Sequence, residues 1–333
     1  MEWDRKMEIY KTMELSTQIV IEEALKRGIE VDVLDEKDNF IRLKKGDKIE
    51  YVKQATKTSL DSYITPLIME NKEVTKIILK EHGIQVPEGI AVASVQQATE
   101  HWEQFAARDI VVKPKSTNFG EGVMILKKPY TFDQFEEAVT IALQYDTAVL
   151  IEQFIPGKEY RFLVIGDCVV AVLHRIPANV TGDGIQTIAD LIEQKNQHPL
   201  RGVGHVTPFE KLVLGEVELA CLRSQGKDPS YVPQAGETVY IRENSNVSTG
   251  GDSIDFTDQI RPEYKQIAIE AVKAVDARIC GLDMIIQDIT ELPDEMNYSI
   301  IELNFNPAVY LHNYPYQGEN RHVERHILDL LGF

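Results

Sequence analysis

Alternating apolar and polar residues predict two neighbouring strands near the end of the chain, over residues 281–286 and 300–307. Turn-like residues separate the two runs, so we expect them to pair as a hairpin. Strand side chains repeat every two residues, which puts Glu302 and Asn304 on one face. A simple antiparallel register then places Asp283 opposite Glu302. Three oxygen-bearing side chains are therefore predicted to converge on an otherwise apolar sheet surface.

Such a cluster favours a hard metal ion. Burying two carboxylates side by side is costly unless a cation neutralises them. The set of Asp283, Glu302 and Asn304 suits Mg²⁺, which retains some water and takes its other ligands from substrate phosphates. The cluster indicates nucleotide-driven phosphoryl chemistry.

Helical and strand patterns are mixed along the rest of the chain. Residues 1–65 are expected to form a small α/β unit whose helix stops at Gly28. The segment 177–255 is mostly irregular, and a loop this long in a compact domain is typically functional. The other elements expected are helices over 71–82, 131–145, 188–196 and 264–280, strands over 111–114 and 148–151, and a hairpin over 160–173.

Composition and charge narrow the classes of partner. The chain has 333 residues, of which 43% are apolar and 26% charged, and its formal net charge is −18. This length exceeds what one core normally holds, so two or three subdomains are expected. Nucleic acid is a poor partner for so acidic a chain, and an anionic nucleotide would need a local cluster of lysines and arginines.

Cysteine usage and the lack of targeting signals favour a reducing cytoplasm. Cys168, Cys221 and Cys280 are isolated and odd in number, which is a poor disulfide framework. The first residues do not resemble a signal peptide, and no apolar run approaches the length of a membrane helix. We therefore expect no membrane partner. The histidines and cysteines are not spaced as a zinc site.

A glycine-containing loop follows the strand over 111–114. Lys113 stands at the strand end, and Ser116, Gly120 and Gly122 lie in the small polar loop after it. The two glycines can adopt backbone angles that aim amides inward, which suits a phosphate lid, and the lysine supplies a point charge. The sequence GxxxxGK[ST] of a Walker A loop is absent. An ordinary hairpin turn explains these residues equally well when they are taken alone.

Two further segments are candidates for nucleotide contact. Lys72, at the start of the helix over 71–82, could be a second phosphate contact, although lysines on helix surfaces are mostly solvated. An adenine ring needs a flat apolar slot with a backbone donor and acceptor at its edge. The extended segment after the strand at 150–155 offers both, and Glu159 could accept the ribose hydroxyls. The alternative is a connection between domains that carries surface acids.

The segment 239–251 is dense in hydrogen-bond donors. Arg242 offers a planar fork for a phosphate or carboxylate. A disordered polar loop is the alternative, but the strand expected over 238–241 argues against it. Backbone amides could wrap an anion in the polar residues that follow, which include Asn246, Ser248, Thr249 and Gly250.

Taken in order, these segments resemble the ATP-grasp ligases over roughly residues 66–333. Agreement at so many spaced positions is more specific than any single motif. The resemblance implies an α/β (α+β) protein with an ATP-grasp fold and a short N-terminal α/β unit. Residues 1–65 would be that unit, 66–150 the small subdomain with the glycine loop, and 151–333 the large subdomain with the metal site.

The same resemblance implies roles for individual residues. Lys72 and Lys113 would contact the ATP phosphates, and Glu159 would bind the ribose. The adenine would be lined by Glu152, Gln153, Phe154 and Ile155. Two Mg²⁺ ions, for which Mn²⁺ can substitute, would be held by Asp283, Glu302 and Asn304.

Finer similarity points to two kinds of relative. The segments 161–166, 178–184, 196–205 and 246–251 are similar to the C-terminal glutathione synthetase module of the bifunctional bacterial enzyme that makes glutathione, and to the ATP-grasp part of cyanophycin synthetase. The N-terminal unit is much closer to the first. The glutamate–cysteine ligase module of that enzyme is missing, as is the Mur-ligase-like half of cyanophycin synthetase. The chain is therefore expected to be an excised module or a separately encoded homologue.

The implied function is that of an ATP-dependent carboxylate–amine ligase, and glutathione synthetase in particular. ATP would phosphorylate γ-glutamylcysteine, and the amine of glycine would attack the acyl-phosphate, releasing ADP and phosphate. Lys113 and Arg242 would stabilise the transition state. An anionic dipeptide suits arginine forks, although structural salt bridges explain any one arginine equally well. The candidate substrate contacts are Arg161, Arg175, Arg201, Asn246, Ser248, Thr249 and Gly250.

Two alternatives stay open at this point. One is a ligase that joins other amino acids or peptides, as in cyanophycin synthesis. The other is a non-catalytic nucleotide-binding protein, against which the retained metal-ligand residues argue. The expected partners are small molecules, and the sequence does not decide between a homo-oligomer and a chain served by a separate glutamate–cysteine ligase.

Overall fold

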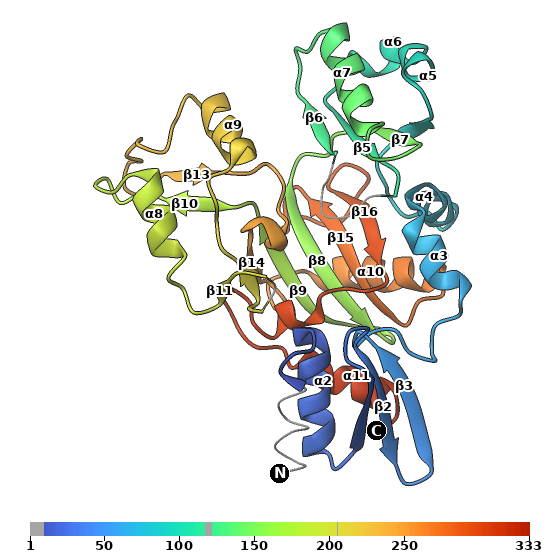
Figure 1. The fold of residues 1–333 in the computed structure, drawn as a ribbon. Coiled ribbons are helices and arrows are strands. Elements are labelled where there is room, and N and C mark those ends of the chain that lie inside the picture. Colours follow the sequence, from blue (N-terminus) through green and yellow to red (C-terminus); the bar gives the residue numbers. More distant parts are fainter. Residues whose placement is uncertain (1–9, 117–121, 205) are drawn as a thin grey trace.

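Five antiparallel strands form a central sheet in the order β14-β9-β8-β15-β16 (Figure 1). The structure is a computed structural model, and it describes residues 10–116, 122–204 and 206–333. The strands are β8 (Lys158–Ile165), β9 (Cys168–Ile176), β14 (Asp252–Asp255), β15 (Ile279–Ile286) and β16 (Tyr298–Asn304). The hairpins β8–β9 and β15–β16 confirm the strand patterns expected from the sequence.

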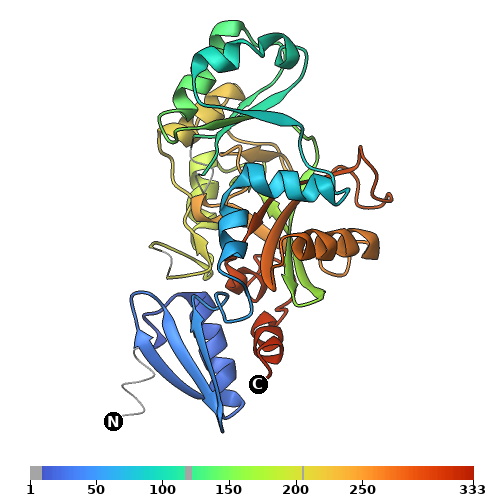
Figure 2. The same ribbon diagram turned by 90° about the vertical axis from the view of Figure 1, so that its right-hand side faces the viewer.

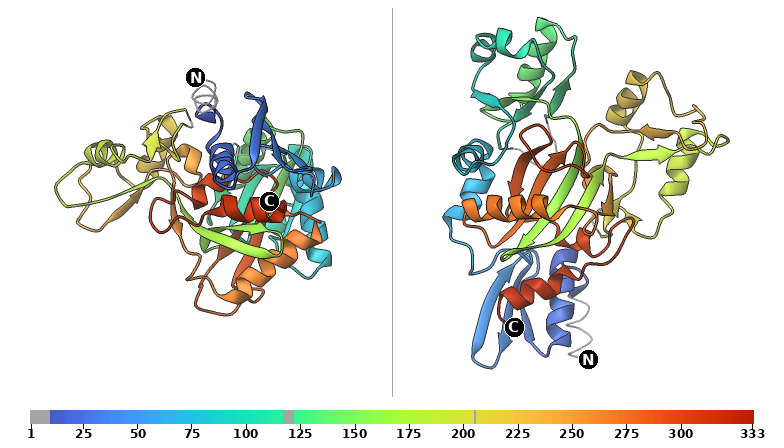
Figure 3. Two further views of the ribbon diagram at one scale, coloured as in Figure 1. Left: turned by 90° about the horizontal axis from the view of Figure 1, so that it is seen from below. Right: turned by 180° about the vertical axis from the view of Figure 1, so that it is seen from behind.

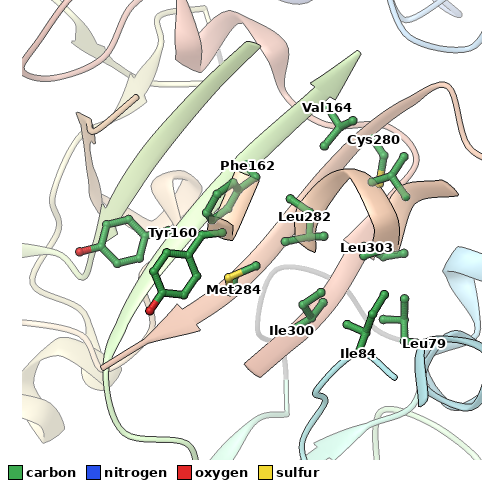
Figure 4. Packing of buried hydrophobic residues seen from close by; sticks show 14 of the residues in the cluster. Leu79, Ile84, Tyr160, Phe162, Val164, Cys280, Leu282, Met284, Ile300 and Leu303 are labelled. Atoms are coloured by element: carbon green, nitrogen blue, oxygen red, sulfur yellow. The ribbon is translucent and has the colours of Figure 1, made fainter. Parts of the chain in front are cut away.

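One face of the central sheet is covered by α3 (Ile64–Glu70), α4 (Lys72–Glu81) and α10 (Pro262–Ala274). Figure 4 shows Phe162, Leu282 and Met284 on this face, with Leu79 of α4 and Ile84 after it packed at the edge near Ile300. Asn71 caps α4 by accepting a hydrogen bond from the backbone amide of Val74 at 3.3 Å. The helix expected over 71–82 is therefore confirmed, together with its start at Lys72.

The helix predicted over 264–280 extends further than the helix that the structure shows. The α10 helix ends at Ala274, and Asp276 has a φ of +55°, a left-handed conformation that stops a helix. The chain then enters β15 at Ile279. Cys280 therefore lies in β15, a buried strand of the central sheet.

A four-stranded sheet in the order β4-β7-β5-β6 stands above the central sheet in Figure 1. Its core is separate and includes Phe105, Phe135 and Val139. A capping box between Thr131 and Gln134 starts α7. The elements are β4 (Gly89–Val92), α5 (Val95–Thr99), α6 (Trp102–Phe105), β5 (Ile110–Pro114), β6 (Met124–Leu126), α7 (Phe132–Ala142) and β7 (Val149–Gln153).

The segment expected to be irregular forms a side lobe with its own small core. Figure 3 shows this lobe beside the central sheet, on the side away from α3 and α4. Its α8 helix was expected, and β13 (Thr238–Tyr240) confirms the strand expected over 238–241, but its other two- and three-residue strands are too short to show a period in the sequence. The elements are β10 (Asn179–Thr181), α8 (Ile188–Lys195), β11 (Arg201–Gly202), β12 (Phe209–Glu210), α9 (Glu216–Ser224), β13 (Thr238–Tyr240) and η1 (Val247–Thr249).

The N-terminal unit packs on the second face of the central sheet. Its core includes Leu163, Ile165 and Ile279 from that sheet. The late helix α11 lies beside α2, where Arg27 donates to Asp329 at 2.6 Å. The elements of the N-terminal unit are α2 (Leu15–Lys26), β1 (Glu30–Asp35), β2 (Phe40–Lys45) and β3 (Lys48–Lys53). The C-terminal elements on this face are η2 (Val309–His312) and α11 (Val323–Leu330).

Figure 2 shows α3 and α4 between the N-terminal unit and the four-stranded sheet. The three-part division at residues 65 and 150 stays a prediction. None of the helices in the described part of the chain has the length and apolarity that a bilayer span requires.

Candidate active site

The three residues expected to bind metal meet on the second face of the central sheet. Asp283 pairs with Glu302 in the β15–β16 register, as the alternation predicted. The amide nitrogen of Asn304 lies 3.3 Å from Glu302 Oε1 and 3.5 Å from Asp283 Oδ2. We call these three side chains the carboxylate face.

Neighbouring strands add two arginines to the carboxylate face. Arg161 on β8 lies opposite Asp283 and donates to both of its carboxylate oxygens, one of them at 2.7 Å. Arg175 Nη1 lies 3.3 Å from Asp283 Oδ2 and 2.9 Å from Glu159 Oε1. Burial raises the pKa of Asp283, but the charges of Arg161 and Arg175 outweigh it and lower the pKa to about 2. Asp283 is therefore ionised at neutral pH.

The donor chemistry of the carboxylate face fits a hard divalent ion. Within the described residues, no group of three or more His, Cys, Asp or Glu side chains could hold a metal ion by itself. Two carboxylates and one amide instead make a partial shell, which water and phosphate oxygens would complete. Arg161 binds both oxygens of Asp283, so Glu302 is the carboxylate that is more available to a metal ion.

A lysine cluster adjoins the carboxylate face. Lys113 Nζ lies 2.9 Å from Glu152 Oε2, and Lys76 contacts the other oxygen of the same carboxylate. Lys72 Nζ lies 3.9 Å from Glu302 Oε2. With all five groups ionised, these three lysines and two carboxylates sum to one positive charge. A site of this kind suits a polyphosphate.

The local sequence explains why Lys113 and Glu152 meet. They alternate along β5 and β7 with Val112 and Ile151, which pack into the core under α7. Both polar side chains therefore lie on the opposite face and are nevertheless buried. Burial lowers the pKa of Lys113, and the charge of Lys72 acts in the same direction. An anionic ligand would relieve this repulsion.

Lys76 is a site residue that the sequence reasoning missed. Burial lowers its pKa, and the charges of Lys113 and Lys72 lower it further. The signal was present, because Lys76 follows Lys72 by four residues and therefore shares its face of α4.

The glycine loop is described only at its ends. The backbone amide of Ser116 donates to Asp146 Oδ2 at 2.6 Å. Gly122 has a φ of +70°, and a Cβ there would lie 2.8 Å from both Pro114 and Tyr145, so glycine is needed for two reasons. Gly120 lies outside the described residues.

The segment expected to line adenine has part of its backbone already paired. The amide of Gln153 donates to the carbonyl of Glu88 at 2.8 Å, and that of Phe154 donates to the carbonyl of Asp109 at 3.0 Å. Ile155, the next residue, is half-buried.

The donor-rich segment is ordered in the structure. Asn246 accepts a hydrogen bond from the amide of Ser248 at 3.2 Å, Thr249 donates to the carbonyl of Asn246 at 2.9 Å, and Gly250 has a φ of +94°. Ser245 donates to Glu159, which brings this segment to the carboxylate face. Arg242, expected to act in catalysis, donates instead to Glu218 at 2.6 Å.

Arg201, expected to bind substrate, lies at the base of the side lobe. It is buried and pairs with Asp252, and Lys195 Nζ lies 2.6 Å from the other oxygen of that carboxylate. Arg201 also donates to the carbonyl of Glu210 at 2.7 Å. Because its side chain has no surface toward solvent, we interpret Arg201 as an attachment of the lobe to the central sheet.

Replacing Arg201 with alanine should destabilise the protein. The change removes one of two cations from a buried carboxylate and frees a buried carbonyl, so we expect a loss of roughly 2–3 kcal/mol in the free energy of unfolding. Denaturant unfolding measures it. Arg223→Ala, an exposed change in the same lobe, should cost little. Equal stability of the two variants would contradict the interpretation.

Comparison with known proteins agrees with this geometry. Residues 11–64 match the family described as an ATP-grasp-like domain, and residues 69–184 match the family described as a RimK-like ATP-grasp domain. The chain therefore contains ATP-grasp domains. The expected ATP-grasp fold is therefore confirmed.

Named ATP-grasp relatives are similar over nearly the whole chain. The chain is 55% identical over 322 residues to the glutathione biosynthesis bifunctional protein GshAB of Clostridium perfringens, covering 97% of this chain and 41% of the relative. Identity to the protein of the same name from Listeria innocua is 53% over 319 residues, covering 96% and 41%.

A solved structure agrees as well. The crystal structure of a bifunctional glutathione synthetase from Pasteurella multocida matches with a TM-score of 0.77 and 44% identity, covering 97% of this chain and 44% of that one. The chain thus spans less than half the length of these relatives.

Proposed function

We propose that the chain is an ADP-forming carboxylate–amine ligase that joins γ-glutamylcysteine to glycine. The contact between the lysine cluster and the carboxylate face carries the proposal, because Lys72 lies beside Glu302 and so joins a phosphate site to a metal site. The names of the relatives, glutathione biosynthesis bifunctional protein and bifunctional glutathione synthetase, support the choice of product.

ATP would lie between the four-stranded and central sheets. Lys113 and Lys72 would contact its phosphates, under the loop that contains Ser116, Gly120 and Gly122. The amides of Gln153 and Phe154 are paired, so we assign the adenine edge to Ile155. Glu159 would accept the ribose hydroxyls.

The carboxylate face would hold Mg²⁺, with two ions expected and Mn²⁺ as a substitute. The ions would supply charge neutralisation for the phosphates and polarise the transferred phosphoryl group. Asp283 is kept ionised by Arg161, while Glu302 and Asn304 remain turned toward the site.

The reaction needs no side-chain nucleophile. The cysteinyl carboxylate of the dipeptide would attack the γ-phosphorus of ATP, and ADP would leave. The amine of glycine would then attack the acyl carbon, lose a proton and displace phosphate. Arg161 and Arg175 would bind the dipeptide carboxylate, and Lys113 would stabilise the negative charge on the transferred phosphoryl group. Arg242 would join them only after leaving Glu218.

A glutamate–cysteine ligase would supply the dipeptide. The greater length of the relatives leaves room for such an activity in the same polypeptide. Because Cys168, Cys221 and Cys280 are free thiols, a reducing cytoplasm remains part of the proposal.

ADP release should depend on γ-glutamylcysteine and glycine together. Purified protein with Mg-ATP is given the pair, each substrate alone, and pairs with aspartate, alanine or arginine in place of the dipeptide. We expect release above background only with the complete pair, and mass spectrometry should show glutathione. Turnover with another amino acid pair, and none with γ-glutamylcysteine, would leave a ligase with a different substrate.

A further inference from the structure

One carboxylate, Glu152, is shared by two lysines that belong to different parts of the fold. Lys113 reaches Glu152 Oε2 from β5, the strand next to β7 in the four-stranded sheet. Lys76 reaches the other oxygen from α4, which packs on the central sheet through Leu79. The Glu152 side chain is 4% exposed, so water cannot replace either partner easily.

Nucleotide binding would disturb this arrangement. If Lys113 turns toward a phosphate, Glu152 keeps only the partner on its other oxygen. A buried carboxylate that loses its last cation is strongly unfavourable. Lys76 is placed to prevent this, because its contact does not involve the oxygen that Lys113 uses.

We propose that Lys76 is a positioning residue, which keeps Glu152 paired while Lys113 contacts the phosphates of ATP. The inference rests on the proposed ATP site and adds a residue to it. It assigns Lys76 no contact with the nucleotide itself.

A second ion pair supports this role for α4. Lys115 Nζ, at the end of β5, lies 2.6 Å from Glu73 Oε2 on the same helix. The pairs Lys76–Glu152 and Lys115–Glu73 therefore join α4 to the four-stranded sheet at two points, one on β7 and one just after β5. The helix can stay in place on that sheet while the Lys113 side chain changes its partner.

The proposal predicts that Lys76→Met weakens ATP binding without removing a ligand contact. Calorimetry with Mg²⁺ and a non-hydrolysable ATP analogue should show that the affinity falls about tenfold or more. In this variant Glu152 has no cation left once Lys113 turns toward the phosphates. Lys76→Arg should restore most of the affinity. Lys80→Met, on the same helix but exposed, should stay within about twofold of wild type.

The decisive comparison uses Glu152→Gln as a background. A neutral amide needs no cation, so adding Lys76→Met to Glu152→Gln should change the affinity by less than about twofold. The double variant leaves no carboxylate at position 152 without a cation, which guards against misfolding from that cause, and Lys113 then keeps a neutral amide there in place of its carboxylate partner. An equal loss in both backgrounds would mean that Lys76 contacts the nucleotide, and would overturn the proposal.

Two other outcomes are equally informative. Wild-type affinity in Lys76→Met alone would refute the positioning role while leaving the ATP site standing. Failure of the wild-type protein to bind the analogue would instead refute the proposed function, and this inference with it.

Discussion

Glu302→Gln should reduce ADP release by at least about 100-fold while leaving the protein folded, a loss of about 2.7 kcal/mol in transition-state stabilisation. The change removes a carboxylate charge from the carboxylate face but keeps the shape of the side chain. Because the Glu302 side chain is 29% exposed and lies on the sheet surface, little packing is lost. Steady-state rates in Mg²⁺ and a thermal unfolding curve measure the two effects.

Rescue by Mn²⁺ and a matched variant test whether the loss in Glu302→Gln comes from the metal site. Mn²⁺ should restore part of the lost rate, because it binds nitrogen and oxygen ligands more tightly than Mg²⁺. Glu295→Gln makes the same chemical change at an exposed position in the turn between β15 and β16, and should leave the rate near that of wild type. Near-normal turnover of Glu302→Gln in Mg²⁺ would show that the carboxylate face is not the metal site.

Lys113→Ala should weaken ATP binding or turnover by well over tenfold. Loss of one partner from a desolvated charge pair typically costs about 2–5 kcal/mol. Here the variant loses a phosphate contact, and Glu152 is left with Lys76 as its cation. Calorimetry with an ATP analogue, followed by single-turnover kinetics, separates binding from chemistry.

Lys115→Ala is the matched control for Lys113→Ala. It removes the same kind of side chain two residues later, where Lys115 pairs with Glu73 on the surface and is 23% exposed. We expect a smaller effect, within a few-fold of wild type. Equal affinity of wild type and Lys113→Ala for the nucleotide would refute the phosphate contact.

The parts of the site that the sequence predicted are those with local determinants. Alternation along β16 put Glu302 and Asn304 on one face, and the expected pairing of Asp283 with Glu302 is confirmed, at a register shift between Asp283 and Met284 that the sequence did not predict. The start of α4 follows from the Asn71 cap. Both signals lie within a few residues of the feature they determine.

The parts that were missed depend on contacts distant in sequence. Arg161 and Asp283 are 122 residues apart, and they meet because β8 pairs with β15, which no local pattern reveals. The pairing of Arg242 with Glu218 likewise depends on how the side lobe folds. An arginine can be recognised as a candidate ligand from sequence, but its partner is decided by topology.

The packing of α2 against α11 has a consequence for synthesis of the chain. Among the described residues, the first helix buries apolar side chains such as Ile19 and Val20 in a core to which Val323 and Ile327 of the last helix also contribute. During translation this core cannot close until α11 has left the ribosome. The apolar surface of the N-terminal unit therefore stays exposed until late in synthesis. A chain interrupted before residue 323 would expose that surface permanently to proteases and chaperones.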